Sequence, residues 1–188
     1  MNRRTGLRTP RGRWIQRGGS HARLGSIRLR PTLVTLYIVF WIVLTGYGVG
    51  MAAHADSLVW AALPFAALLI VALRVAGPKS EQIGWAAFTG WLGMTYAHTG
   101  GPVEVGVFFV YVALGALGVF RSPWFLVVAW AGHIAWDFLP RALPSEYASL
   151  PLACMIFDGL IALYLGWNAW SGRWQPLAPD TQPGVVEA

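Results

Sequence analysis

After its first thirty residues the chain carries almost no charge, and this scarcity limits what it can fold into. Residues 31–188 contain five basic side chains, namely Arg74, Lys79, Arg121, Arg141 and Arg173. The whole chain is 56% hydrophobic and 12% charged, whereas soluble domains are about 45–50% apolar and about 25% charged. So few charges cannot cover a surface that faces water, but they suit a surface that faces lipid. The sequence therefore predicts an integral membrane protein.

Apolar segments of helical length recur along the chain and are separated by Gly and Pro. A helix needs about 17–25 residues to cross a bilayer, and the third and fifth segments lie at the short limit. The predicted fold class is all-α, a polytopic membrane bundle of about six transmembrane helices within residues 31–172. The segments are 31–50, 57–77, 82–97, 103–120, 123–139 and 149–170.

Two tails flank this domain. Residues 1–30 contain nine Arg and no Asp or Glu, which predicts a disordered cytoplasmic tail because so polar a segment cannot bury a core. The tail serves as a topology signal or as a contact with anionic headgroups. Residues 173–188 are rich in Pro and are predicted to be a disordered C-terminal tail.

The basic residues also predict an orientation. Six spans place both termini on one side of the membrane. That side receives thirteen of the fourteen Lys and Arg residues, and only Arg141 lies on the other. By the positive-inside rule both termini are cytoplasmic. The expected location is the plasma (inner) membrane, crossed several times.

Ionisable residues near the spans gather on the side opposite the termini. A charge in hydrocarbon is costly, so such residues are candidates for function. His133 lies about 9 Å and Asp158 about 13 Å from the outer ends of their segments, at about 1.5 Å per residue. Because a short loop joins the last two segments, these two side chains can meet, with Asp137 one turn from His133. The residues in this outer half are His54, Asp56, His98, Glu104, His133, Asp137 and Asp158.

The last two segments carry a pattern of interest. Gly132-His133-Ile134-Ala135-Trp136-Asp137 is followed by Cys154-Met155-Ile156-Phe157-Asp158. This pattern resembles small, uncharacterised bacterial multi-span membrane proteins that have Gly-His-x-x-aromatic-Asp in the penultimate helix and a deep Asp in the last. The resemblance implies that His133, Asp137 and Asp158 belong together, and it implies no activity.

Three functions remain open. The leading hypothesis is a structural or partner-binding membrane subunit, in which these polar groups join helices. Its partners would be the lipid bilayer and a second copy or another membrane protein, and nucleic acid is not expected because topology accounts for the basic tail. The second hypothesis is a lipid hydrolase-like enzyme with an outward-facing site. The third is a small proton-coupled transporter built on His133 and Asp158.

The enzyme hypothesis has candidate residues in named roles. The catalytic candidates are His133, Asp137, Asp158 and Glu104, which could transfer protons. His133, Asp137 and Asp158 could also hold a divalent metal, the candidate cofactor, which would activate water. The single cysteine, Cys154, excludes an intrachain disulfide and a cysteine-based zinc site.

Small and aromatic residues lead to two packing predictions. The spacings Gly46–Gly50 and Gly115–Gly118 predict close helix approach. Tryptophan is enriched at membrane interfaces. The predicted interface anchors include Trp60, Trp85, Trp124, Trp136, Trp167 and Trp170.

Overall fold

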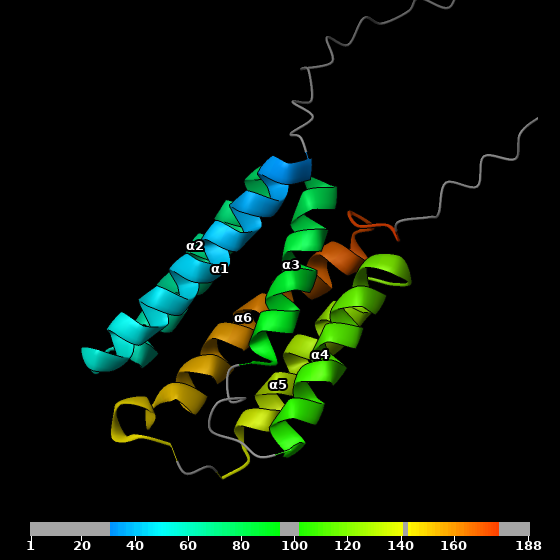
Figure 1. The fold of residues 1–188 in the computed structure, drawn as a ribbon. Coiled ribbons are helices and arrows are strands. Elements are labelled where there is room, and N and C mark those ends of the chain that lie inside the picture. The colour runs from blue at the N-terminus through cyan, green and yellow to red at the C-terminus, as the bar shows by residue number, and fades with distance from the viewer. Residues whose placement is uncertain (1–30, 95–101, 141–142, 177–188) are drawn as a thin grey trace, which may run out of the picture.

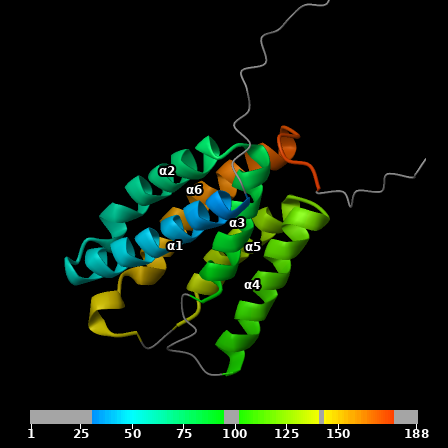
Figure 2. The ribbon, with the colours of Figure 1, turned by 45° about the horizontal axis from the view of Figure 1, so that its top comes forward.

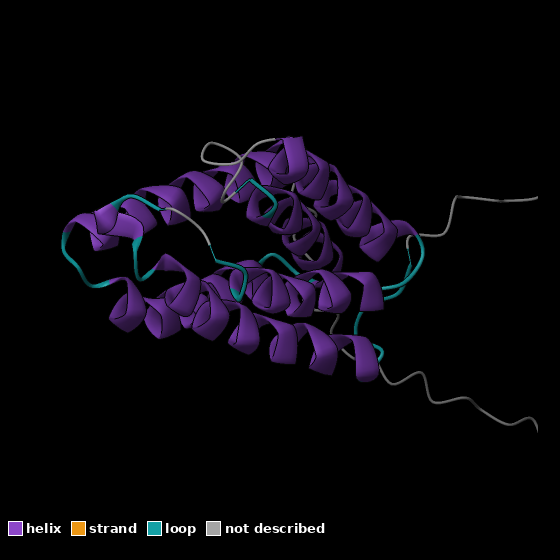
Figure 3. Ribbon diagram, turned by 90° about the horizontal axis from the view of Figure 1, so that it is seen from below, coloured by secondary structure: helices purple, strands orange, loops and turns teal. Residues whose placement is uncertain are grey.

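The computed structural model describes residues 31–94, 102–140 and 143–176. Within these ranges every regular element is a helix (Figures 1 and 3), which confirms the all-α prediction. The expected tail 1–30, residues 177–188 of the expected tail 173–188, His98 and Arg141 lie outside the described residues. The helices are α1 (Pro31–His54), α2 (Leu58–Val75), α3 (Pro78–Leu92), α4 (Pro102–Phe120), α5 (Trp124–Asp137), the short η1 (Ser145–Tyr147) and α6 (Leu150–Trp170).

The six α-helices run alternately up and down (Figure 1). Helices α3 and α6 lie between the pair α1/α2 and the pair α4/α5 (Figures 1 and 2). The most extensive contacts join α5 to α6, α3 to α4 and α2 to α6. The start of α1 and the end of α6 lie at one end of the bundle, called here the terminal end. The opposite end, called the loop end, carries the end of α1, the end of α5 and the start of α6.

Four of the helical segments are long and apolar enough to cross a membrane, namely Pro31–His54, Leu58–Val75, Pro102–Phe120 and Ser145–Trp170. Helices α3 and α5 have 15 and 14 residues, fewer than the roughly 17–25 of a usual span. Large apolar side chains on α1 point outward, with Leu36 61% and Val43 65% exposed. Soluble monomers rarely expose apolar faces of this kind, so this face suits contact with lipid better than contact with water.

Helix α3 differs from its predicted position. It begins at Pro78 and ends at Leu92, whereas the apolar pattern predicted 82–97. Proline suits the first helical position because its missing N–H needs no partner there, so Gly77 and Pro78 start the helix. The shift places Glu81 in the first turn of α3, within the bundle.

Two tryptophans form the centre of the core. Trp85 and Trp130 are both 0% exposed and meet edge to face at 5.7 Å between ring centroids. The indole Nε1 of Trp130 donates to Thr89 Oγ1 at 2.9 Å. The prediction that Trp85 is an interface anchor is therefore wrong, because the ring packs between helices. Trp60, Trp124, Trp167 and Trp170 are exposed, as anchors would be.

The two glycine spacings behave differently. A Cβ on Gly115 would lie 2.7 Å from the carbonyl oxygen of Ala86, so α4 approaches the backbone of α3 closely. A Cβ on Gly118 would meet Leu126 at 2.5 Å. By contrast, Gly50 has open space beside it and Gly46 has only Trp91 at 3.9 Å. Close approach is thus confirmed at Gly115–Gly118 and is wrong at Gly46–Gly50.

The chain just after α6 packs against the terminal end. Arg173 donates to Glu81 Oε2 from Nε at 3.2 Å and from Nη2 at 2.9 Å. The next residue, Trp174, is 2% exposed. The predicted tail boundary at residue 173 therefore falls too early, because a carboxylate on α3 holds Arg173.

Candidate functional site

Helices α5 and α6 bring three ionisable side chains together near the loop end. His133 Nδ1 lies 2.7 Å from Asp158 Oδ2, a hydrogen bond that joins the two helices. The same nitrogen lies 3.2 Å from Asp137 Oδ2. The residues His133, Asp137 and Asp158 are 1%, 4% and 0% exposed. His133, Asp137 and Asp158 are called here the acid–base cluster.

The sequence of α5 explains how two members of the cluster face inward. Leu126, Trp130, His133 and Asp137 recur at three- and four-residue intervals and are all buried. This spacing keeps them on one helical face, and that face packs on α6. The polar pair therefore continues the stripe that buries the tryptophan core.

Asp158 comes from the middle of the facing helix. It lies about 12 Å along α6 from Leu150, at about 1.5 Å per residue. The buried stripe of α6 includes Ala153, Asp158, Ile161 and Leu165. The expected meeting of His133 and Asp158 is confirmed by their hydrogen bond.

A tyrosine on α4 closes another side of the cluster. The Tyr111 ring meets the His133 ring edge to face at 5.7 Å between centroids and is 6% exposed. Glu104, two turns earlier on α4, is partly exposed and does not join the group of ligand atoms formed by the cluster. Among the four predicted catalytic candidates, Glu104 is therefore the one outside this group of ligand atoms.

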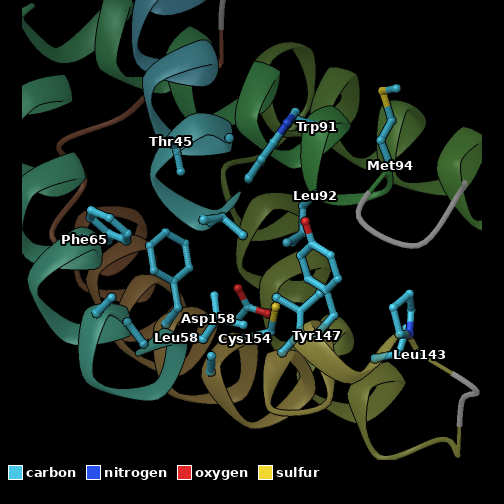
Figure 4. A pocket seen from close by; sticks show the side chains of 18 residues that line it. Thr45, Leu58, Phe65, Trp91, Leu92, Met94, Leu143, Tyr147, Cys154 and Asp158 are labelled. Atoms are coloured by element: carbon cyan, nitrogen blue, oxygen red, sulfur yellow. The ribbon is translucent and has the colours of Figure 1, made fainter. Parts of the chain in front are cut away.

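An apolar pocket of about 310 Å³ reaches the cluster from the loop end. Its walls come from α1, α2, the end of α3, the segment around η1, and α6, and Figure 4 shows their side chains converging. Asp158 and Cys154, one turn apart on α6, both line it. Other lining residues are Val49, Leu58, Phe65, Leu92, Tyr147 and Phe157.

One oxygen of Asp158 has no hydrogen-bond partner among the described residues. Its Oδ2 accepts from His133, while Oδ1 is buried and unpartnered. A buried polar atom without a partner is costly. Figure 4 shows the carboxylate beside Cys154 on the wall of the pocket. A group held in the pocket could supply the missing hydrogen bond.

The cluster can also be measured against a metal site. One ligand atom from each residue lies within 4.8 Å of the others. Tetrahedral zinc with ligands at about 2.0–2.2 Å separates ligand atoms by about 3.4 Å. The 2.7 Å between His133 Nδ1 and Asp158 Oδ2 is shorter than this. A metal bound by both atoms would therefore have to move them about 0.7 Å farther apart. The geometry suits a shared proton better than a bound ion.

A second polar cluster occupies the terminal end and was missed in the sequence. Glu81, 0% exposed, accepts from Arg173 and from the hydroxyl of Tyr164, to which Arg74 Nη1 donates at 3.1 Å. The expectation that all carboxylates near the spans lie on one side is thus wrong. The sequence did hold a signal for this cluster: Glu81 is an isolated carboxylate beside an apolar segment, on the predicted side that carries most of the basic residues.

The other predicted outer residues lie at the exposed rim. His54 is the last residue of α1, and its Nδ1 lies 2.8 Å from the Gly50 carbonyl oxygen. Asp56 occupies the turn before α2 with a φ of 49°. Both are exposed, as expected for a solvated turn.

Comparisons with known proteins give no match to a family model, a curated protein or a solved structure. The functional argument therefore depends on the geometry of the chain itself.

Proposed function

We propose that this protein is a membrane-embedded enzyme that performs acid–base chemistry on a small lipophilic molecule. One observation carries the proposal: Asp158 belongs to the buried acid–base cluster and also lines the apolar pocket. Apolar clefts with a few polar groups at one point are typical of small-molecule sites. The volume of about 310 Å³ lies within the usual range of about 300–1,000 Å³.

Each member of the cluster has a distinct role in this proposal. Asp158 touches the ligand and exchanges a proton with its polar end, so it is the catalytic residue. His133 Nδ1 lies 2.7 Å from Asp158 Oδ2, so its N–H can donate to that carboxylate and hold it in place on the pocket wall. Asp137, at 3.2 Å from the same nitrogen, fixes the orientation of the imidazole. A base held by a third group is the usual arrangement for proton transfer.

We further propose that all six α-helices cross the membrane, with both termini in the cytoplasm and the pocket opening outward. Support comes from the alternating directions of the helices (Figure 1) and from the basic residues Arg74, Lys79, Arg121 and Arg173 in loops or helix ends at the terminal end. Helices α3 and α5 are short, but each packs along a longer neighbour, α3 on α4 and α5 on α6. The plasma membrane is the proposed location.

A structural role is the second candidate, and one contact favours it. The bond from His133 to Asp158 joins α5 to α6, and such interhelical bonds contribute about 0.6 kcal/mol on average. The transporter hypothesis gains no comparable support. Transport would need a path that continues from the cluster toward the terminal end. There Trp130, Ile161 and Leu165, all 0% exposed, fill the core beside the cluster.

The test compares wild type with His133→Gln in vesicles made from the total lipid extract of the expression host, which includes its uncharged lipophilic molecules. Mass spectrometry of the extracted lipids follows every species with time. We expect at least one species to be converted by wild type and to be unchanged by His133→Gln. The matched control is His54→Gln, which alters an exposed histidine at the same end and should convert at the wild-type rate.

Two outcomes would contradict the enzyme. Equal conversion by wild type and His133→Gln would show that the cluster is not involved. If no species is bound or converted, and His133→Gln changes only the unfolding midpoint, the structural role is the better explanation. Metal analysis of the same samples also tests the choice of mechanism, because a stoichiometric metal lost in His133→Gln would replace the proton network by a metal site.

A further inference from the structure

The polar side chains that line the pocket indicate which polar group its ligand should have. Thr45, Tyr147, Cys154 and Asp158 are the lining residues with hydroxyl, thiol or carboxyl groups, and no Lys, Arg or His lines it within the described part of the chain. Asp158 is thus the one formal charge that residues 31–94, 102–140 and 143–176 place on the wall. Among the described lining residues, an anionic headgroup would find no cation and would face the Asp158 carboxylate.

The carboxylate itself is incompletely bonded. Asp158 is 0% exposed, its Oδ2 accepts from His133 Nδ1 at 2.7 Å, and its Oδ1 has no partner among the described residues. A buried carboxylate is stabilised by hydrogen bonds to its oxygens. The group that would complete Oδ1 must therefore be a donor, such as O–H or N–H.

The apolar residues of the wall and the volume of the pocket indicate the nature and size of the rest of the ligand. Leu58, Phe65, Leu150 and Phe157 from α2 and α6 give it an apolar lining (Figure 4). With a volume of about 310 Å³, the pocket lies at the small end of ligand sites. One short apolar chain or ring system fits this space.

From these contacts we propose that the pocket selects amphiphiles whose polar end is a hydrogen-bond donor without negative charge, an alcohol or an amine, and rejects carboxylates and phosphates. This inference rests on the proposed function and names its substrate class. The donor would lie against Asp158 Oδ1, and the apolar part would lie between α1, α2 and α6. Alcohol and amine share the donor, and the experiment distinguishes them.

Cys154 supplies a readout inside the pocket. It is the single cysteine of the chain, it is partly buried, and it lines the pocket one turn from Asp158. In nanodiscs, its alkylation by N-ethylmaleimide is timed with 1-octanol, octylamine or octanoate at equal concentration. Native mass spectrometry counts bound probe in the same samples, so the test does not depend on thiol reactivity.

We expect octanol and octylamine to slow alkylation at least tenfold more than octanoate and to appear as bound adducts. In Asp158→Asn the charge is lost, so the advantage of octylamine over octanoate should fall at least tenfold. The matched control is Glu146→Gln, which removes an exposed carboxylate from η1 and should keep the wild-type order. If Asp158→Asn fails to fold, the three probes on wild type decide the matter.

The outcomes separate this inference from the proposed function. Octanoate binding as well as or better than the other two would overturn the donor rule and leave the pocket as a ligand site. If none of the three binds or protects, and Ala61→Phe at the pocket wall also leaves alkylation unchanged, both the donor rule and the ligand site fail.

Discussion

His133 is held between carboxylates from its own helix and from the next, with one nitrogen 2.7 Å from Asp158 and 3.2 Å from Asp137. With both acids buried, the imidazole between them is the group that offsets their mutual repulsion. Removing it leaves two carboxyl groups facing each other inside the bundle. The energetic role of the histidine should therefore exceed that of one ordinary hydrogen bond.

At this residue we expect His133→Leu to lower the free energy of unfolding by about 3 kcal/mol, as when one partner of a buried pair is removed. The double variant His133→Leu/Asp158→Leu should recover part of the loss, since one of the two unmatched acids is gone and only Asp137 remains without its partner. Unfolding in mixed micelles by SDS measures both. A loss of about 0.6 kcal/mol or less in the single variant, the average for interhelical hydrogen bonds, would contradict this.

The terminal end depends on a different residue pair. Glu81 is 0% exposed and receives two hydrogen bonds from Arg173. We expect Arg173→Met to cost about 1.5–3 kcal/mol of unfolding free energy, the usual contribution of hydrogen bonds to a charged group. The same micelle unfolding measures it, and the exposed Lys79→Met should stay within about 0.5 kcal/mol. Equal effects in the two variants would show that Glu81 does not depend on Arg173.

At the scale of elements, helix α4 approaches α3 through the glycine at its buried face. Gly115→Ala would place a Cβ 2.7 Å from the carbonyl oxygen of Ala86, and backbone cannot move aside cheaply. We expect a loss of about 1–3 kcal/mol, as for overpacked cores. Thermal unfolding in detergent measures this loss.

The matched control is Gly50→Ala. Gly50 is also a glycine within a helix, but no atom lies within 4 Å of the position that its Cβ would take. Alanine there should be neutral or raise stability by about 0.5–1 kcal/mol, since glycine is a poor helix residue. If both variants change stability equally, the close contact between α3 and α4 does not matter.

For the whole molecule, the alternation of helices in Figure 1 predicts which loops share a side. In a Cys154→Ala background, we expect Ser145→Cys at the loop end to react with an impermeant maleimide added to intact cells. Ser171→Cys at the terminal end should react only after lysis. Both serines are exposed, so accessibility does not bias the pair. Reaction of Ser171→Cys from outside would reverse the proposed orientation.

The helices themselves were largely predictable from the sequence. Hydrophobicity and helix-breaking Gly and Pro act locally, so five of the six segments fell close to their observed bounds. The approach of His133 to Asp137 follows from their i, i+4 spacing within α5. The approach of His133 to Asp158 followed from a short connection between neighbouring helices.

What the sequence by itself determined is an apolar helical chain suited to lipid, with a polar pair on α5 and a deep acid on α6. Only the tertiary structure decided that Glu81 meets Arg173, 92 residues away, that Trp85 is buried, and that Asp158 borders a pocket built mainly from α1, α2 and α6. The physical reason is that these features depend on which helix faces meet. Apolar side chains lie on both the core-facing and the lipid-facing sides of these helices. The pattern of apolar residues in the sequence therefore distinguishes the two sides poorly.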